Sequence, residues 1–166
     1  MTGPSRPFTT VLDVLRAEID HEAFDAALFS LESVAADLGY GDVRALPGSV
    51  AWIEKLRESG KRTGLFATGE RADAALELAG ITHLFDSVTS GSRSVATVRA
   101  AIDELGAEPE RTIVVAATAD GVTAARTAEA AIVIAIARGL STPEQLRQAG
   151  AHAVVADLVE LMRAVT

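Results

Sequence analysis

Residues 24–37 read FDAALFSLESVAAD, and this stretch decides the fold. Residues 26–31 form a short apolar run, which is typical of a strand buried on both faces of a parallel sheet. Small and polar residues follow it directly, so we expect the strand to run into a tight turn. In open α/β sheets, ligands bind beyond the carboxyl ends of the strands, and therefore at turns of this kind.

Short apolar runs of the same kind alternate with segments of helical spacing along the whole chain. Strands are predicted over residues 26–31, 63–67, 85–89, 112–117, 131–137 and 153–155, and helices over residues 10–22, 47–60, 71–79, 95–105, 120–130, 141–150 and 158–165. Strands that alternate with helices pair in parallel and need helices on both faces. Right-handed crossovers then give an α/β fold with a Rossmann-like, doubly wound parallel sheet.

Composition excludes several classes of function. The chain has 166 residues, a net charge of −8 and no cysteine. The charge argues against nucleic-acid binding and docking on an anionic membrane, and the missing cysteines exclude disulfides and zinc-thiolate sites. The N-terminus shows no signal-peptide pattern, and no apolar run is long enough to span a bilayer. We expect a cytoplasmic protein with a leader and short helix over residues 1–23 and a single domain over residues 24–166.

Five stretches, in order, resemble the haloacid dehalogenase-like superfamily, and within it the phosphoglycolate phosphatase and beta-phosphoglucomutase group. They are FDAALFSLESV, LPGSVAWIEKLRESGKRTGLFAT, LAGITHLFDSVTSG, ERTIVVAATADGVTAARTAEA and GAHAVVADLVELMRAV. The resemblance implies that family's Rossmann-like core. Only residues 33–46 separate Glu32 from Pro47, so the cap domain that most of this group inserts there is expected to be absent.

The resemblance also implies a mechanism. In that family an aspartate after the first strand attacks phosphorus and forms an aspartyl-phosphate, and a second aspartate two residues on is the general acid and base. Mg²⁺ is held by the nucleophile, a backbone carbonyl and a carboxylate after the fourth strand. A Ser or Thr and a Lys bind the phosphoryl oxygens.

This chain departs from the family at both aspartates of the first motif. Ser30 occupies the nucleophile position, but a serine hydroxyl is a weak nucleophile without a base, and no histidine is near in sequence. The alternative is a serine that caps a buried strand. Glu32 occupies the acid/base position and keeps a carboxylate one methylene longer. It is either a proton shuttle or a solvated turn residue.

The phosphate-binding motifs are only partly kept. Thr68 matches the second motif, and its hydroxyl with the following amides, from Gly69 onward, could cradle an anion at a helix start. A plain helix cap would use the same geometry. The lysine of the third motif is absent, and Ser92 and Arg93 stand near its position. Arg93 keeps the positive charge, although a guanidinium does not replace an ammonium; a solvated loop arginine is the other interpretation.

The fourth motif lacks its carboxylates. Its acidic pair falls at Ala116 and Ala117, and Asp120 comes three residues later, where we expect it to cap the next helix rather than face a metal. Mg²⁺ needs one or two protein carboxylates besides water and phosphate. Loss of Mg²⁺ binding is therefore predicted, with no other cofactor implied.

These departures together predict a catalytically inactive pseudoenzyme that acts as a binding, regulatory or assembly protein. The alternative is a weak or divergent phosphohydrolase that uses Glu32 as general base, with Thr68 and Arg93 on the phosphate. A phosphate-bearing small ligand, an unidentified protein partner and self-association all remain open. Residues 34–46 are expected to form a loop or a small flap, which could form an interface through contacts at Leu38, Tyr40, Val43 and Leu46. The other interpretation is that these side chains pack on their own domain.

Overall fold

The structure is a computed structural model that describes residues 24–68, 72–91 and 94–159. The predicted helix over residues 10–22 and most of the one over residues 158–165 lie outside these ranges. The strands are β1 (Ala26–Ser30), β2 (Ala35–Asp37), β3 (Val43–Ala45), β4 (Arg62–Thr68), β5 (Ser87–Gly91), β6 (Thr112–Ala116), β7 (Ile132–Ile136) and β8 (Ala153–Val155).

Helices connect these strands. They are α2 (Leu31–Val34), α3 (Ser49–Glu58), α4 (Ala72–Ala79), α5 (Val95–Glu104), α6 (Ala119–Thr127) and α7 (Pro143–Ala149), with short 3₁₀ helices η2 (Thr82–Leu84) and η3 (Pro109–Arg111). Every predicted strand and helix within the described ranges is present, with ends that differ by at most three residues. None of the helices in the described part is long and apolar enough to cross a membrane.

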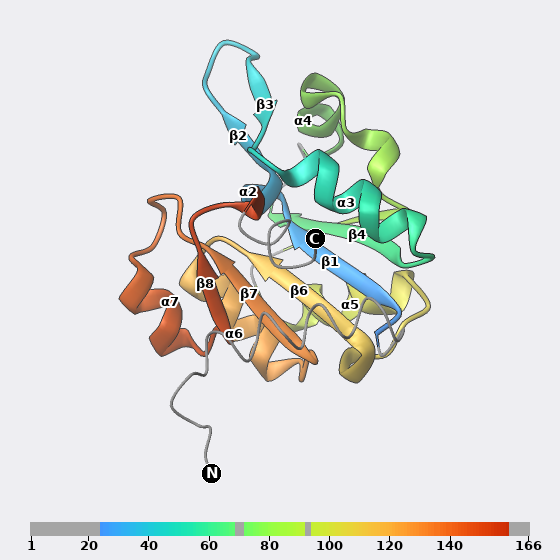
Figure 1. The fold of residues 1–166 in the computed structure, drawn as a ribbon, viewed down its shortest axis with the longest axis vertical. Helices are drawn as coiled ribbons and strands as arrows, with labels where there is room; N and C mark the ends of the chain where they lie inside the picture. Colours follow the sequence, from blue (N-terminus) through green and yellow to red (C-terminus); the bar gives the residue numbers. More distant parts are fainter. Residues whose placement is uncertain (1–23, 69–71, 92–93, 160–166) are drawn as a thin grey trace.

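The main sheet confirms the predicted doubly wound topology. Its strand order is β5-β4-β1-β6-β7-β8, and all neighbouring pairs are parallel. The chain leaves β1 toward β4 and β5, then returns to β6 on the other side of β1, so the topological switch point lies between β1 and β6 (Figure 1). Ligand sites in such sheets lie beyond the carboxyl ends of the strands at this point.

Two hydrophobic cores lie on opposite faces of the sheet. In β1, Ala27 and Phe29 join the core that contains α3 and α4, and Ala26 and Leu28 join the one that contains α5, α6 and α7. All five residues of β1, β6 and β7 are buried. Burial on both faces explains why these strands read as continuous apolar runs rather than as alternating patterns.

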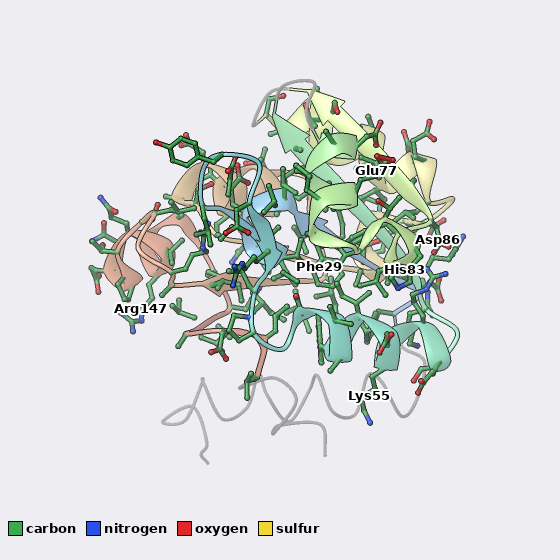
Figure 2. The ribbon with its side chains drawn as sticks, turned by 90° about the horizontal axis from the view of Figure 1, so that it is seen from above. Phe29, Lys55, Glu77, His83, Asp86 and Arg147 are labelled. Carbon is green, nitrogen blue, oxygen red and sulfur yellow. The ribbon has the colours of Figure 1, made fainter. Side chains whose placement is uncertain are left out.

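A few larger side chains organise the first core. The Phe29 and Trp52 rings meet edge to face, with centroids 5.8 Å apart and an angle of 82° between their planes. Figure 2 shows Phe29 inside the molecule and the charged Lys55 of α3 on its surface. The Pro47–Gly48 turn starts α3 as the sequence predicts, with Gly48 at a φ of 81°. These contacts fix α3 against β1, and β1 is the strand that carries the first motif.

Residues 34–46 form the small flap that the sequence predicts. β2 and β3 pair as an antiparallel hairpin, separate from the main sheet. The hairpin projects beyond the carboxyl ends of the parallel strands, beside α4 (Figure 1). It therefore stands over the end of the sheet where a ligand is expected.

Candidate functional site

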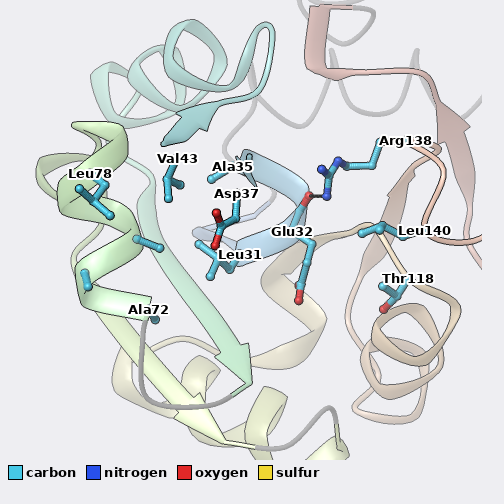
Figure 3. A pocket seen from close by; sticks show the side chains of 12 residues that line it. Leu31, Glu32, Ala35, Asp37, Val43, Ala72, Leu78, Thr118, Arg138 and Leu140 are labelled. Carbon is cyan, nitrogen blue, oxygen red and sulfur yellow. Dashed lines mark hydrogen bonds between the residues drawn. The ribbon is translucent and has the colours of Figure 1, made fainter. Parts of the chain in front are cut away.

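A pocket of about 510 Å³ lies at the carboxyl end of the sheet, under the flap. Its walls come from α2, the β2–β3 hairpin, α4 and the loops after β6 and β7 (Figure 3). It is lined by Leu31, Glu32, Ala35, Asp37, Val43, Ala72, Ala74, Ala75, Leu78, Thr118, Arg138 and Leu140. A volume of this size is in the range of small-molecule sites. The lining is mainly aliphatic, with a few polar groups on one side.

Ser30 ends β1 but does not line this pocket. It is only 5% exposed, and its Oγ has no hydrogen-bond partner among the described residues. It is the last residue of the buried strand β1 and stands at the N-cap position of α2, where its side chain makes no cap bond to the helix. Its carbonyl instead accepts a 2.7 Å hydrogen bond from the Ser33 hydroxyl. No described group is placed to activate the Ser30 hydroxyl as a nucleophile.

Glu32 is the one predicted site residue, among those described, that lines the pocket. It lies in the first turn of α2 and is half-buried, not in a solvated turn. Its side chain points down the pocket toward the side where Thr118 lies (Figure 3). Its backbone carbonyl accepts a 3.3 Å hydrogen bond from Nη1 of Arg138.

The predicted anion cradle cannot be built from the described residues. Thr68 ends β4, as the second motif requires, and its backbone pairs with Gly91 of β5. Gly69 and Arg93 lie outside the described residues. The roles of the Thr68 hydroxyl, Gly69 and Arg93 in phosphate binding therefore stay predictions.

The end of β6 carries no carboxylate. Ala117 follows β6 and is 1% exposed, packed in the first core. Thr118 is the N-cap of α6, because its hydroxyl accepts a 3.1 Å hydrogen bond from the amide of Gly121. The predicted cap at Asp120 is thus wrong: Asp120 is an exposed residue in the first turn of α6. There its negative charge interacts favourably with the helix dipole, and Asp120 does not line the pocket.

The residues in place do not fit Mg²⁺. Within the described ranges, no group of three or more acidic or histidine side chains could hold a metal ion. At the carboxyl ends of β1 and β6 the described side-chain oxygens are the hydroxyls of Ser30 and Thr118 and the carboxylate of Glu32, because Ala117 has none. Mg²⁺ favours octahedral oxygen coordination with carboxylate ligands. No step through a metal is derived for this site.

Sequence reasoning missed Arg138, which follows β7 and lines the pocket from the side opposite α4 (Figure 3). The rule that strand ends carry ligand groups points to it, because it comes two residues after the end of the strand at residues 132–136. The family motifs do not, since none of them reaches this loop. Its neighbour Leu140 was missed for the same reason, and the α4 residue Leu78 was missed although it begins the third stretch that resembles the family.

The flap residues divide between the two interpretations considered for them. Val43 is buried in the first core and lines the pocket. Leu46 is half-buried, and Leu38 and Tyr40 are exposed near the hairpin tip. Val43 therefore packs on its own domain, and only Leu38 and Tyr40 remain candidates for contact with another molecule.

Comparison with known proteins adds to this geometry. Residues 8–129 match the family of haloacid dehalogenase-like hydrolases. A trehalose-phosphate phosphatase of Mycobacterium leprae (strain TN) is 35% identical over 151 residues, which are 87% of this chain and 33% of that protein. This chain thus spans about a third of the length of the curated relative.

Solved structures agree on the fold. A haloacid dehalogenase family hydrolase from Deinococcus radiodurans R1, with bound phosphate and sodium, has a TM-score of 0.75 at 19% identity, covering 86% of this chain and 95% of that one. A Thermotoga maritima protein assigned by inference as a beta-phosphoglucomutase has a TM-score of 0.75 at 16% identity, covering 86% and 98%. The match over residues 8–129 and the shared architecture place this chain in the haloacid dehalogenase-like hydrolase family.

Proposed function

We propose that this chain is a ligand-binding member of its family that does not run the aspartyl-phosphate reaction. That reaction forms a covalent bond between an enzyme carboxylate and phosphorus. The single observation that carries the proposal is the side-chain chemistry at the two central strand ends. Ser30 ends β1 with a buried hydroxyl that has no partner among the described residues, and Ala117 follows β6 with no polar atom in its side chain.

Electrostatics support the same proposal. The family mechanism relies on several carboxylates that hold Mg²⁺. The Mg²⁺ ion in turn offsets the negative charge of the phosphate. Glu32 is the one carboxylate that the described residues bring to the end of β1, and most of the residues in the pocket wall are aliphatic. A site of this composition is better suited to holding an organic ligand than to gathering a divalent cation and a phosphate.

The second candidate is a weak or divergent phosphohydrolase. Family membership and the trehalose-phosphate phosphatase relative favour it, and taken alone they favour it over an inactive protein. Glu32 lies in the pocket wall and supplies a carboxylate for this role. In such a mechanism Glu32 accepts a proton from water as the water attacks phosphorus, the bond to the leaving oxygen breaks, and no covalent intermediate forms.

A phosphoester panel separates the two candidates. The full chain is assayed with and without Mg²⁺ on an aryl phosphate, a set of sugar phosphates and a trehalose phosphate, beside Glu32→Gln and a control, Glu144→Gln. Glu144 is an exposed residue of α7 outside the pocket. The proposal expects no turnover by any of the three proteins.

The second candidate expects a different pattern. Turnover by the wild type and by Glu144→Gln that is abolished in Glu32→Gln would establish the hydrolase and remove our proposal. Turnover that survives Glu32→Gln would point to a contaminating phosphatase, which a second purification by a different route would remove.

A further inference from the structure

Arg138 is a cationic side chain in the pocket without an acidic partner in the described structure. It is half-buried, and its Nη1 donates a 3.3 Å hydrogen bond to the carbonyl oxygen of Glu32. None of the ion pairs between described residues involves it. A guanidinium has five N–H donors in a planar fork, so most of its donor capacity is available to a ligand.

The wall opposite Arg138 is aliphatic. It is formed by α4, through Ala72, Ala75 and Leu78, with Val43 of the flap beside it (Figure 3). Leu78 is 56% exposed and Leu140 is 49% exposed, so two large apolar side chains border the pocket without being covered. Exposed apolar surface of this kind, next to a cavity, marks a place where an apolar group binds.

The charges of the pocket select among ligands. Glu32 and Asp37 contribute two negative charges and Arg138 one positive charge, so the pocket repels a doubly charged phosphate about twice as strongly as a singly charged carboxylate. Asp37 is exposed to solvent, which screens its charge, and its Oδ1 accepts a 2.9 Å hydrogen bond from the amide of Gly39. An amine ligand would compete with this contact, whereas a carboxylate would complete the hydrogen bonds of Arg138.

We propose that this pocket binds a singly charged organic carboxylate with an apolar body. The carboxylate would accept paired hydrogen bonds from the Arg138 fork, and the apolar body would lie against Ala75, Leu78 and Leu140. A bidentate arginine–carboxylate contact gives directional recognition that a single positive charge does not. The inference deepens the proposed function, on which it rests, by naming the ligand class of the same pocket.

Three eight-carbon probes with different head groups test the ligand class. Isothermal titration calorimetry on the full chain compares octanoate, octylamine and octanol, with inorganic phosphate as a fourth probe. Octanoate is expected to bind most tightly, octanol more weakly, and octylamine and phosphate without measurable heat. Octylamine binding as tightly as octanoate, or phosphate binding more tightly, would overturn the proposal, as would no binding of octanoate.

Variants test whether Arg138 provides the selectivity. Arg138→Gln is expected to weaken the binding of octanoate at least about tenfold, because the charge-assisted hydrogen bonds are lost. The affinity for octanol should stay unchanged. Arg138→Lys keeps the charge but loses the fork, so its affinity for octanoate should lie between those of the wild type and Arg138→Gln. Ala75→Phe should weaken both octanoate and octanol by filling the pocket. Arg147→Gln is the matched control, since Arg147 lies on the surface of α7 (Figure 2).

The outcomes separate this inference from the proposed function. If Arg138→Gln binds octanoate like the wild type, the inference fails even where the phosphoester panel shows no turnover. If the panel shows turnover that depends on Glu32, the proposed function fails. The octanoate measurements then still decide whether the pocket binds a carboxylate through Arg138. Circular dichroism of each variant establishes that a lost heat signal reports binding and not unfolding.

Discussion

His152 and Val133 exchange two hydrogen bonds across the edge of the sheet. The Nδ1 of His152 accepts from the amide of Val133 at 2.9 Å, and the amide of His152 donates to the carbonyl of Val133 at 2.8 Å. The imidazole of His152 thus takes the place of a backbone carbonyl as acceptor for the Val133 amide, just before the edge strand β8. Only the neutral ring can accept at Nδ1, so the edge is coupled to the protonation of His152.

Acid should destabilise the protein through His152. Burial, and then the charge of Arg126, lower the pKa of His152 from its ordinary value of 6.5. The unfolded chain therefore binds a proton at a higher pH than the folded one, and the free energy of unfolding falls as the pH drops from about 6.5 through the lowered pKa. Urea unfolding at several pH values around this window measures the slope.

The variant His152→Asn isolates this effect, because its side-chain oxygen can accept the Val133 hydrogen bond but does not titrate in this range. We expect it to flatten the dependence on pH below about 6.5. An identical pH dependence in wild type and variant would show that His152 does not couple the edge strand to pH.

Asp25 and Arg111 tie the start of β1 to η3, at the amino end of the sheet. Two hydrogen bonds join them, Nε to Oδ2 at 2.7 Å and Nη2 to Oδ1 at 3.0 Å. The hydrogen bond with Arg111 is the main cause that lowers the pKa of Asp25 below 3.8. Both side chains are about 40% exposed, so solvent screens the pair.

The substitution Asp25→Asn should therefore have a small effect that depends on pH. Near pH 7 we expect a loss of about 0.5–1 kcal/mol in the free energy of unfolding, and less at high salt. Because the folded pKa is depressed, this contribution is present above 3.8 and disappears as the pH falls through the lowered value. A difference between wild type and Asp25→Asn that stays constant down to about pH 3 would contradict this account.

Gly48 is the glycine whose replacement should cost most in stability. Its φ is +81°, and a Cβ there would lie 2.5 Å from the amide nitrogen of Val159. Gly60 is the matched control, with a φ of +85° and open space around its Cβ position. Alanine at either site should lower the free energy of unfolding by about 1–2 kcal/mol, because a left-handed backbone is unfavourable for a residue with a Cβ.

At Gly48 alanine must also displace the backbone near Val159, which should add about 1–3 kcal/mol. Chemical denaturation of Gly48→Ala and Gly60→Ala measures the difference directly. Equal losses for the two variants would mean that the packing of the Leu158–Val159 segment on the Pro47–Gly48 turn contributes nothing to stability.

The sequence predicted the fold well because its signals are local. Each buried strand reads as an apolar run, and glycines end several of the helices, so element order and the parallel sheet follow from short patterns. Strand ends are less certain because tertiary pairing decides them: β4 begins at Arg62, one residue before the predicted run. The antiparallel flap was expected only as a loop or short flap, since three-residue strands carry little periodicity.

The site was harder to predict because side-chain direction depends on turns of three or four residues. Thr118 caps α6 where Asp120 was expected, since the helix starts one residue earlier than its apolar pattern suggests. Glu32 enters the pocket because β1 runs straight into α2. Arg138 belongs to no motif, and its place opposite α4 follows only from the sheet order, which brings β7 beside β6.

The account's central claim is that the family's covalent chemistry is missing because two carboxylates are missing. Restoring them tests it. Ser30→Asp with Ala117→Asp puts aspartates at the ends of β1 and β6, with Ser30→Asn and Ala117→Asn together as an uncharged control of similar size. Folding of both double variants is checked by circular dichroism, because both positions are buried.

The measurement is Mg²⁺-dependent release of phosphate from an aryl phosphate by the wild type and the two double variants. We predict none from the wild type and the asparagine control, and slight but Mg²⁺-dependent release from the aspartate variant. Mg²⁺-dependent release by the wild type, at a rate the aspartates do not raise, would contradict the claim and make this chain a working phosphohydrolase.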